Sequence, residues 1–209
     1  MEPLIFLVSG GGVIALVLWA IQHDRKKRRA NLTSLAQRLG LEVGATEKSW
    51  VGTQFEVRGQ RLGKDVRFWS FTTGSGKSRR HWVAVGVRAK DVGEMKFNLQ
   101  RQGFGTRVAE WFGAKEITVG DRAFDDAWFV RTSEPDYFGV ALVAPIRAKL
   151  MAARAAGATE DFKLEDGWVS YAERGSFSSE RHVARLESLV PVLYDLADVA
   201  EVCAAAIKP

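Results

Sequence analysis

The sequence predicts an α+β fold in which a single N-terminal transmembrane helix precedes a domain with a mostly antiparallel β-sheet and two or three packed helices. Three observations carry this prediction. An uncharged apolar stretch opens the chain, two later regions alternate with the period of a strand, and the helical period returns after Ser178. A chain of 209 residues has room for an anchor at residues 1–30 and a cytoplasmic domain at residues 31–209.

The first element is the apolar stretch Pro3–Ile21, which contains no charged residue. As a helix it would span roughly 28 Å at ~1.5 Å per residue, close to a hydrocarbon core of about 30 Å. Trp19 lies near its far end, where interfacial indoles are favoured. The pattern favours a membrane anchor. A cleaved signal peptide is an alternative, but its basic residues would precede the apolar stretch, and here they follow it. A buried core helix is the third interpretation.

A basic run follows the anchor directly. The chain has 30 Lys and Arg against 25 Asp and Glu, a net charge of +5, so a run of five bases accounts for the whole excess. Because basic residues mark the cytoplasmic side, we expect a single-pass protein of the inner (plasma) membrane with its N-terminus outside. The side chains of the run are candidate contacts for anionic lipid headgroups. They are Arg25, Lys26, Lys27, Arg28 and Arg29.

The same charge distribution bears on the partners of the protein. A protein that tracks nucleic acid spreads its excess charge over a binding face, so we expect no nucleic acid partner. Within the anchor, Gly11 and Ala15 form a pair of small residues that lets two membrane helices approach closely. They are candidate helix–helix contacts, although glycine is also common in membrane helices generally. The predicted partners are the lipid bilayer and another membrane protein or a second copy of the chain.

The next elements belong to the first half of the domain. Asn31 can cap a helix whose apolar residues share one face, or this helix can continue directly from the anchor; Gly40 ends it. Strands are expected near residues 55–58, 66–71, 81–87 and 95–99. A loop at residues 103–113 is a possible boundary between two lobes, 31–105 and 114–209.

The second half is expected to begin with strands at residues 117–119 and 128–132. A helix should start after Ser133, restart at Pro145 and end at Gly157. A hairpin across residues 162–171 follows. The apolar stripe after Ser178 is typical of a core-facing helix, with a kink expected at Pro191.

The glycine-rich stretch GSGKS at residues 74–78 ends as many phosphate-binding loops do. Such a loop needs a further glycine at position 71, which is Phe71, and a helix after the loop, where the sequence alternates like a strand. The stretch is better explained as a hairpin turn that pairs Phe68 with Val85 and Trp69 with Ala84. This interpretation predicts no nucleotide binding and places three further candidate headgroup contacts at an exposed tip, Lys77, Arg79 and Arg80.

No pattern of catalytic, cofactor-binding or metal-ligating residues is evident in the sequence. His23, His81 and His182 lack metal-site spacing. Residues 121–126 contain three acids, a grouping that could bind a cation, but Asp121 and Asp125 are expected to make turn contacts with the backbone instead.

The stretch Ile117–Val130, followed by Pro135 and a helix with Arg147 and Leu150, resembles a segment of bacterial proteins that combine an N-terminal membrane segment with a domain of unknown function. In those proteins a Gly-Asp…Phe-Asp…Phe-x-Val stretch precedes a helix, a hairpin and a closing helix. The resemblance covers about the C-terminal half of the chain. It implies a bacterial, membrane-associated domain and carries over no catalytic residue.

Two function classes follow. The first is a membrane-tethered cytoplasmic interaction module, such as a scaffold or an accessory subunit without a catalytic site. The second is a membrane-associated enzyme that uses acids of residues 121–126. Binding of anionic lipid through the basic tip is a third hypothesis. Convergence of the acids on a concave pocket would favour the enzyme.

Overall fold

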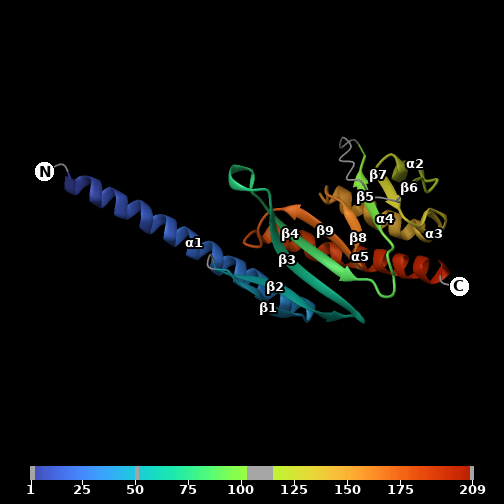
Figure 1. The fold of residues 1–209 in the computed structure, drawn as a ribbon, viewed down its shortest axis with the longest axis horizontal. Coiled ribbons are helices and arrows are strands. Elements are labelled where there is room, and N and C mark those ends of the chain that lie inside the picture. Colours follow the sequence, from blue (N-terminus) through green and yellow to red (C-terminus); the bar gives the residue numbers. More distant parts are fainter. Residues whose placement is uncertain (1–2, 50–51, 103–114, 208–209) are drawn as a thin grey trace.

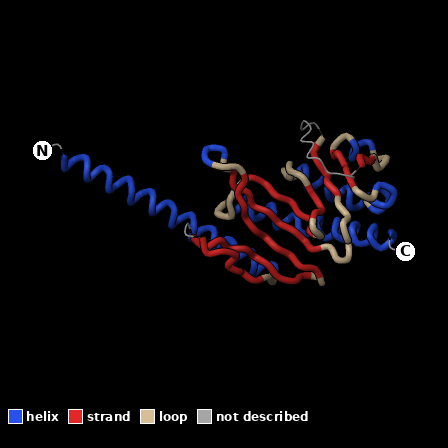
Figure 2. Tube along the Cα trace, viewed as in Figure 1, coloured by secondary structure: helices blue, strands red, loops and turns tan. Residues whose placement is uncertain are grey.

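The computed structural model describes residues 3–49, 52–102 and 115–207, and the side chains of these residues except 3–15, 45–49 and 52–54. Helices alternate irregularly with strands along the chain (Figures 1 and 2). The helices are α1 (Pro3–Leu39), α2 (Arg122–Asp125), α3 (Pro135–Ala141), α4 (Ala144–Ala155) and α5 (Glu180–Ile207). The strands are β1 (Glu42–Ser49), β2 (Gly52–Arg61), β3 (Lys64–Thr73), β4 (Arg80–Arg88), β5 (Phe97–Arg101), β6 (Lys115–Ile117), β7 (Trp128–Thr132), β8 (Phe162–Glu165) and β9 (Trp168–Arg174).

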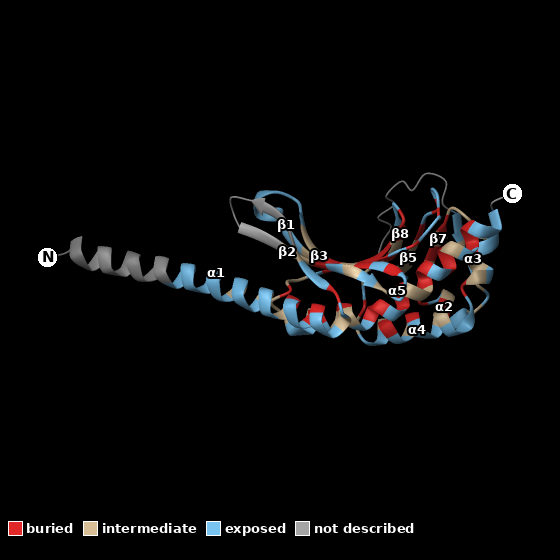
Figure 3. Ribbon diagram, turned by 90° about the horizontal axis from the view of Figure 1, so that it is seen from below, coloured by how far each residue is buried: buried red, intermediate tan, exposed pale blue. Residues whose placement is uncertain are grey.

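In the described residues the strands form a 9-stranded sheet in the order β1-β2-β3-β4-β9-β8-β5-β7-β6. All pairings within it are antiparallel. The helices lie against one face of this sheet, and the described residues leave the opposite face open (Figure 3). The predicted α+β class with a mostly antiparallel sheet is therefore confirmed. The expected lobe boundary falls in residues 103–114, outside the described part of the chain.

The hairpin of β3 and β4 has the register that the sequence predicts. Phe68 pairs with Val85 and Trp69 pairs with Ala84. Val85 points toward the helices and is fully buried, whereas Trp69 lies on the open face and is half-buried. The alternation of the two strands thus separates a core face from an outer face, as period two requires.

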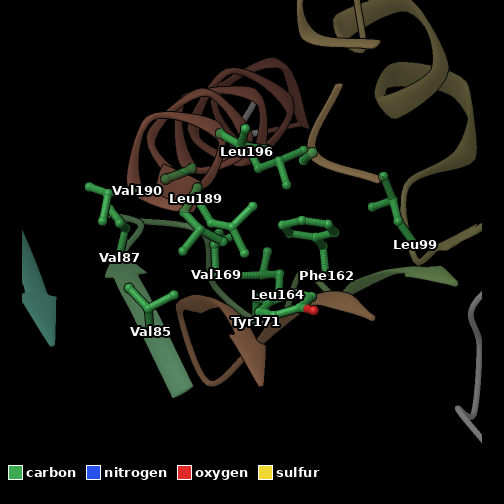
Figure 4. Packing of buried hydrophobic residues seen from close by; sticks show 14 of the residues in the cluster. Val85, Val87, Leu99, Phe162, Leu164, Val169, Tyr171, Leu189, Val190 and Leu196 are labelled. Carbon is green, nitrogen blue, oxygen red and sulfur yellow. The ribbon is translucent and has the colours of Figure 1, made fainter. Parts of the chain in front are cut away.

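The core lies between the sheet and α5. Side chains from β4, β8 and β9 point toward one face of α5, which is the predicted apolar stripe (Figure 4). Leu189 and Leu196 of α5 are buried against these strands. The helix continues through Pro191 from Glu180 to Ile207. A stripe of this kind stabilises a fold mainly through the apolar area that it removes from water.

The N-terminal helix α1 is continuous from Pro3 to Leu39. The prediction that Asn31 caps a separate helix is therefore wrong, and the alternative of a helix that continues from the apolar stretch is correct. Asn31 lies inside α1 and donates from its side chain to the carbonyl of Phe177 at 2.8 Å. Gly40 ends the helix with φ of +67°, a conformation that glycine adopts without strain.

Three strands differ from the expectation. The strand expected at residues 117–119 lies two residues earlier, as β6 at Lys115–Ile117. β1 was not predicted, because it is largely polar and carries few of the branched and aromatic residues that mark strands. The strand expected at residues 95–99 begins later, at Phe97, since Met95 belongs to a turn in which its N–H donates to the carbonyl of Val92. The predicted break between α3 and α4 is confirmed, with Pro145 in the first turn of α4.

Candidate membrane-facing surface

The last part of α1 is built into the domain. Leu32 and Leu35 are fully buried, and this part of the helix contacts β1, β2 and α5. Because the helix is unbroken, the basic run ends less than two turns before these core residues on the same rigid element. The domain therefore holds the basic run in a fixed place relative to its own strands.

The basic run itself lies along the mostly exposed surface of α1 where the helix leaves the domain (Figure 1). Arg28 forms an ion pair with Asp24 one turn earlier, at 3.3 Å. The guanidinium of Arg29 lies over the ring of Phe55 in β2, 5.6 Å from its centroid. The end of the β1–β2 hairpin that includes Phe55 therefore lies beside the basic run.

The β3–β4 turn is exposed over residues 72–80. A short 3-10 helix at Gly76–Ser78 forms its tip. Gly74 is required there, since its φ is +74° and a Cβ atom would lie 2.6 Å from the carbonyl oxygen of Ser78. The predicted hairpin tip is confirmed. The stretch 74–78 is followed by strand β4, whereas a phosphate-binding loop is followed by an α-helix. The side chains of Lys77, Arg79 and Arg80 make no ion pair or hydrogen bond with the described residues.

A short chain of contacts links this tip to α1. At the base of the tip, the carbonyl of His81 accepts a hydrogen bond from the N–H of Gly175 at 3.1 Å. Two residues later, the carbonyl of Phe177 accepts from Asn31 of α1, which follows the basic run. The tip, the β1–β2 hairpin and the connection from β9 to α5 consequently lie at the same end of the domain, where α1 leaves it (Figures 1 and 3).

Behind the tip, a row of rings and a guanidinium crosses the open face. Phe71 and Trp82 are neighbours across the strands and stack with their planes 5° apart and their centroids 6.1 Å apart. Arg174 of β9 lies over Trp82 at 5.6 Å. The indole N–H of Trp82 donates to the hydroxyl of Thr73 at 2.8 Å. Sequence analysis did not select this row, although the alternation that predicts the hairpin also places Phe71 and Trp82 on its outer face.

Farther along the open face, Arg67 is held between two indoles. Its guanidinium lies 4.2 Å from the ring centroid of Trp69 and 4.1 Å from that of Trp168. Burial lowers the pKa of Arg67, and the charge of Arg88 acts in the same direction. A cleft of about 380 Å³ lies beside Arg67 and Trp168, with Glu56 and Asp65 also in its wall. This stack joins β3 to β9, which are far apart in the sequence, so no local sequence pattern could identify it.

The acids of residues 121–126 have local structural roles. Asp121 accepts from the backbone N–H of Phe124, caps α2 and pairs with Arg147 at 3.1 Å. The hydrogen bond from Phe124 is the main cause that lowers the pKa of Asp121. Asp125 accepts from the backbone N–H of Val119 at 2.9 Å. These contacts confirm the predicted side-chain-to-backbone role.

Among the described residues, the three acids contact separate partners. The carboxylate of Asp126 is exposed and lies 3.7 Å from Arg122, on the surface of α2. Within residues 16–44, 55–102 and 115–207, no group of three His, Cys, Asp or Glu side chains is arranged to hold a metal ion. The enzyme hypothesis thus finds no support in the geometry of these acids.

The anchor prediction falls largely on residues whose side chains lie outside the described part, Gly11 and Ala15 among them. Among the residues whose side chains are described, no helix combines the length and the apolar character needed to cross a bilayer. The transmembrane span therefore stays a prediction.

Comparison with models of protein families finds no match, and comparison with curated proteins finds none either. Among solved structures, the fold is similar to the crystal structure of the mycobacterial trehalose monomycolate transport factor A, TtfA. The two share 14% sequence identity with a TM-score of 0.57, and the similarity covers 85% of this chain and 96% of that one. At this identity the likeness concerns the fold.

Proposed function

We propose that this chain is a membrane-tethered accessory protein whose cytoplasmic domain binds another component of a membrane assembly. The observation that carries the proposal is the unbroken helix α1, which joins the uncharged stretch Pro3–Ile21, the basic run and the domain core in one element. An apolar helix followed by bases is typical of a span with its C-terminal side in the cytoplasm.

The structural neighbour supports this assignment at the level of fold. It is named a trehalose monomycolate transport factor, and 96% of it aligns with 85% of this chain. We extend from it only the class of function, namely an accessory protein that works beside a membrane transport protein. The resemblance of residues 117–130 to bacterial membrane-anchored proteins favours the inner membrane of a bacterium as the site.

The anchor is tested by fractionation of the full chain. Deletion of residues 3–21 should move the protein from the membrane fraction to the soluble fraction, and an unrelated transmembrane helix in their place should restore it. A reporter fused after Pro209 should be active only if it is a type that works in the cytoplasm. Activity of a periplasmic reporter would reverse the proposed orientation.

The accessory role is tested by cross-linking in native membranes followed by capture of the full chain. The matched control carries residues 1–30 fused to an unrelated soluble domain. We expect a membrane transport protein to be enriched with the full chain and not with this control. Equal recovery of membrane proteins with both would contradict the proposed role, because the anchor alone would then explain the association.

A further inference from the structure

The tip of the β3–β4 hairpin presents positive charge that the described residues leave uncompensated. Lys77, Arg79 and Arg80 project from a turn that is exposed over its whole length. The acids nearest in sequence, Asp65 and Asp91, lie toward the other end of β3 and β4. Such an unpaired cluster has a favourable interaction with an anionic surface that an ion-paired cluster lacks.

The fold holds this cluster beside the basic run, at a similar position along the axis of α1. The bonds from Gly175 to His81 and from Asn31 to Phe177 connect the base of the tip to the helix just after Arg29. In Figures 1 and 3 the tip lies at the end of the domain from which α1 departs. A bilayer that meets the basic run would therefore also meet the tip.

The side chains of Phe71, Trp82 and Arg174, which lie behind the tip, are also suited to the headgroup region of a bilayer. Phe71 and Trp82 are half-buried rings on the open face, and Arg174 extends over Trp82. Trp82 lies two residues from Arg80, or about 7 Å along a strand. Indole rings with a satisfied N–H and long basic side chains are typical of the headgroup region, since each combines an apolar body with a polar end.

We infer that the β3–β4 tip is a second membrane contact, in which Lys77, Arg79 and Arg80 bind the anionic headgroups of the leaflet through which α1 enters. The inference rests on the proposed function, because it requires α1 to be anchored. The contact fixes which way the open face of the sheet is turned relative to the bilayer. The anchor supplies attachment, and the tip supplies orientation.

The test uses the full chain in lipid vesicles. An environment-sensitive fluorophore is attached at Ser75→Cys, beside the three bases. The native Cys203 is fully buried, and burial raises the pKa of its thiol to about 11, so it stays unlabelled in the folded protein. Vesicles contain either phosphatidylcholine alone or phosphatidylcholine with phosphatidylglycerol, together with a lipid that quenches the fluorophore on contact.

We expect quenching in the anionic vesicles only, with loss at ~1 M salt, where the screening length falls to about 3 Å. Each base near an anionic surface is worth about fivefold in the contact equilibrium. Replacing Lys77, Arg79 and Arg80 by Ser should thus weaken contact on the order of 100-fold and abolish the quenching. A control with the same change in charge, Lys90→Ser, Lys96→Ser and Arg122→Ser, alters exposed bases elsewhere and should leave the quenching intact.

A second variant keeps every charge. Seven helix-forming residues inserted after Arg29 lengthen α1 by about 10 Å and nearly preserve its helical phase. The tip is lifted from the leaflet by about one screening length, so quenching should be lost while the protein stays in the membrane. This variant separates the position of the tip from its composition.

Flotation of the vesicles separates the two ways of failing. If the full chain does not float with either vesicle, the anchor and the proposed function are wrong, and the inference falls with them. If it floats with both and the fluorophore gives the same signal in neutral and anionic vesicles, the anchor holds and the inference is overturned. The three bases would then be solubilising charges on an exposed turn.

Discussion

A charge pair beneath the sheet joins β9 to α5, and its removal should have a large effect on stability. Glu173 is only 5% exposed, and its carboxylate accepts hydrogen bonds from Arg185 at 3.0 Å and from the Tyr171 hydroxyl at 3.3 Å. Arg185 also donates to the carbonyl of Gly157 at 2.8 Å. We predict that Arg185→Met destabilises the fold, because it leaves a buried carboxylate without its cation.

The magnitude follows from the burial of the pair. Breaking a buried ion pair by removing one partner costs about 3–5 kcal/mol, and the lost bond to Gly157 adds about 1 kcal/mol. The side chain of Arg185 is 16% exposed, which favours the lower part of this range. We therefore expect Arg185→Met to lower the free energy of unfolding by about 4 kcal/mol, out of a typical total of ~5–15 kcal/mol.

The assay is a double-mutant cycle by urea unfolding of the full chain in mild detergent, followed by tryptophan fluorescence. Glu173→Gln keeps an acceptor for Tyr171 and should cost about 2 kcal/mol. The double variant should be more stable than the sum of the single effects by about 1–3 kcal/mol, because it no longer buries an unpaired charge. Additivity within about 0.5 kcal/mol would refute the reasoning, since the two groups would then not depend on each other.

Two further predictions concern β3 and β4. Lys64 pairs with Glu201 and Asp198 of α5. Burial acts to raise the pKa of Glu201, but the hydrogen bonds that its carboxylate accepts from Lys64 and from the Lys90 N–H outweigh burial. The pKa of Glu201 therefore lies below the ordinary 4.5. The stability that the Glu201 carboxylate contributes is complete above pH 4.5 and is lost as the pH falls through its lowered pKa. Lys64→Met should therefore reduce the free energy of unfolding at pH 7 by about 1–2 kcal/mol. It should also flatten the acid side of a profile of stability against pH. Gly86 lies under Trp69, where a Cβ atom would be 3.2 Å from the ring. Gly86→Val should displace the indole and destabilise by about 1–3 kcal/mol in thermal unfolding, and an unchanged melting temperature would contradict this packing.

The elements that the sequence predicts correctly are those with strong local patterns. The register of β3 and β4 follows from alternation and from a turn that needs Gly74. The long helix α5 follows from its apolar stripe. The order of the sheet has no such signal. β5 lies between β8 and β7, two strands that follow it in sequence, and only tertiary packing selects these partners.

The same distinction applies to the candidate surface. The five bases of the run and the three bases of the β3–β4 tip are evident from the sequence. Their placement at the same end of the domain depends on contacts between segments that are distant in the sequence. Asn31 shows why: its residue type suggests a helix cap, whereas its use is a bond to Phe177 that positions the last connection of the chain. A local rule fails there because a long-range contact uses the same side chain.

Because α1 is continuous, the positions of the basic run and of the tip are fixed relative to each other. A flexible linker between anchor and domain would let the domain turn freely, and the position of Lys77 relative to the bilayer would carry no information. Here the helix that bears Arg25 and Arg29 also buries Leu32 and Leu35 in the domain core. The height of the tip along α1 is then set by helix geometry at ~1.5 Å per residue. In the proposed membrane orientation, the open face behind the tip would keep a fixed direction toward a partner in the same membrane.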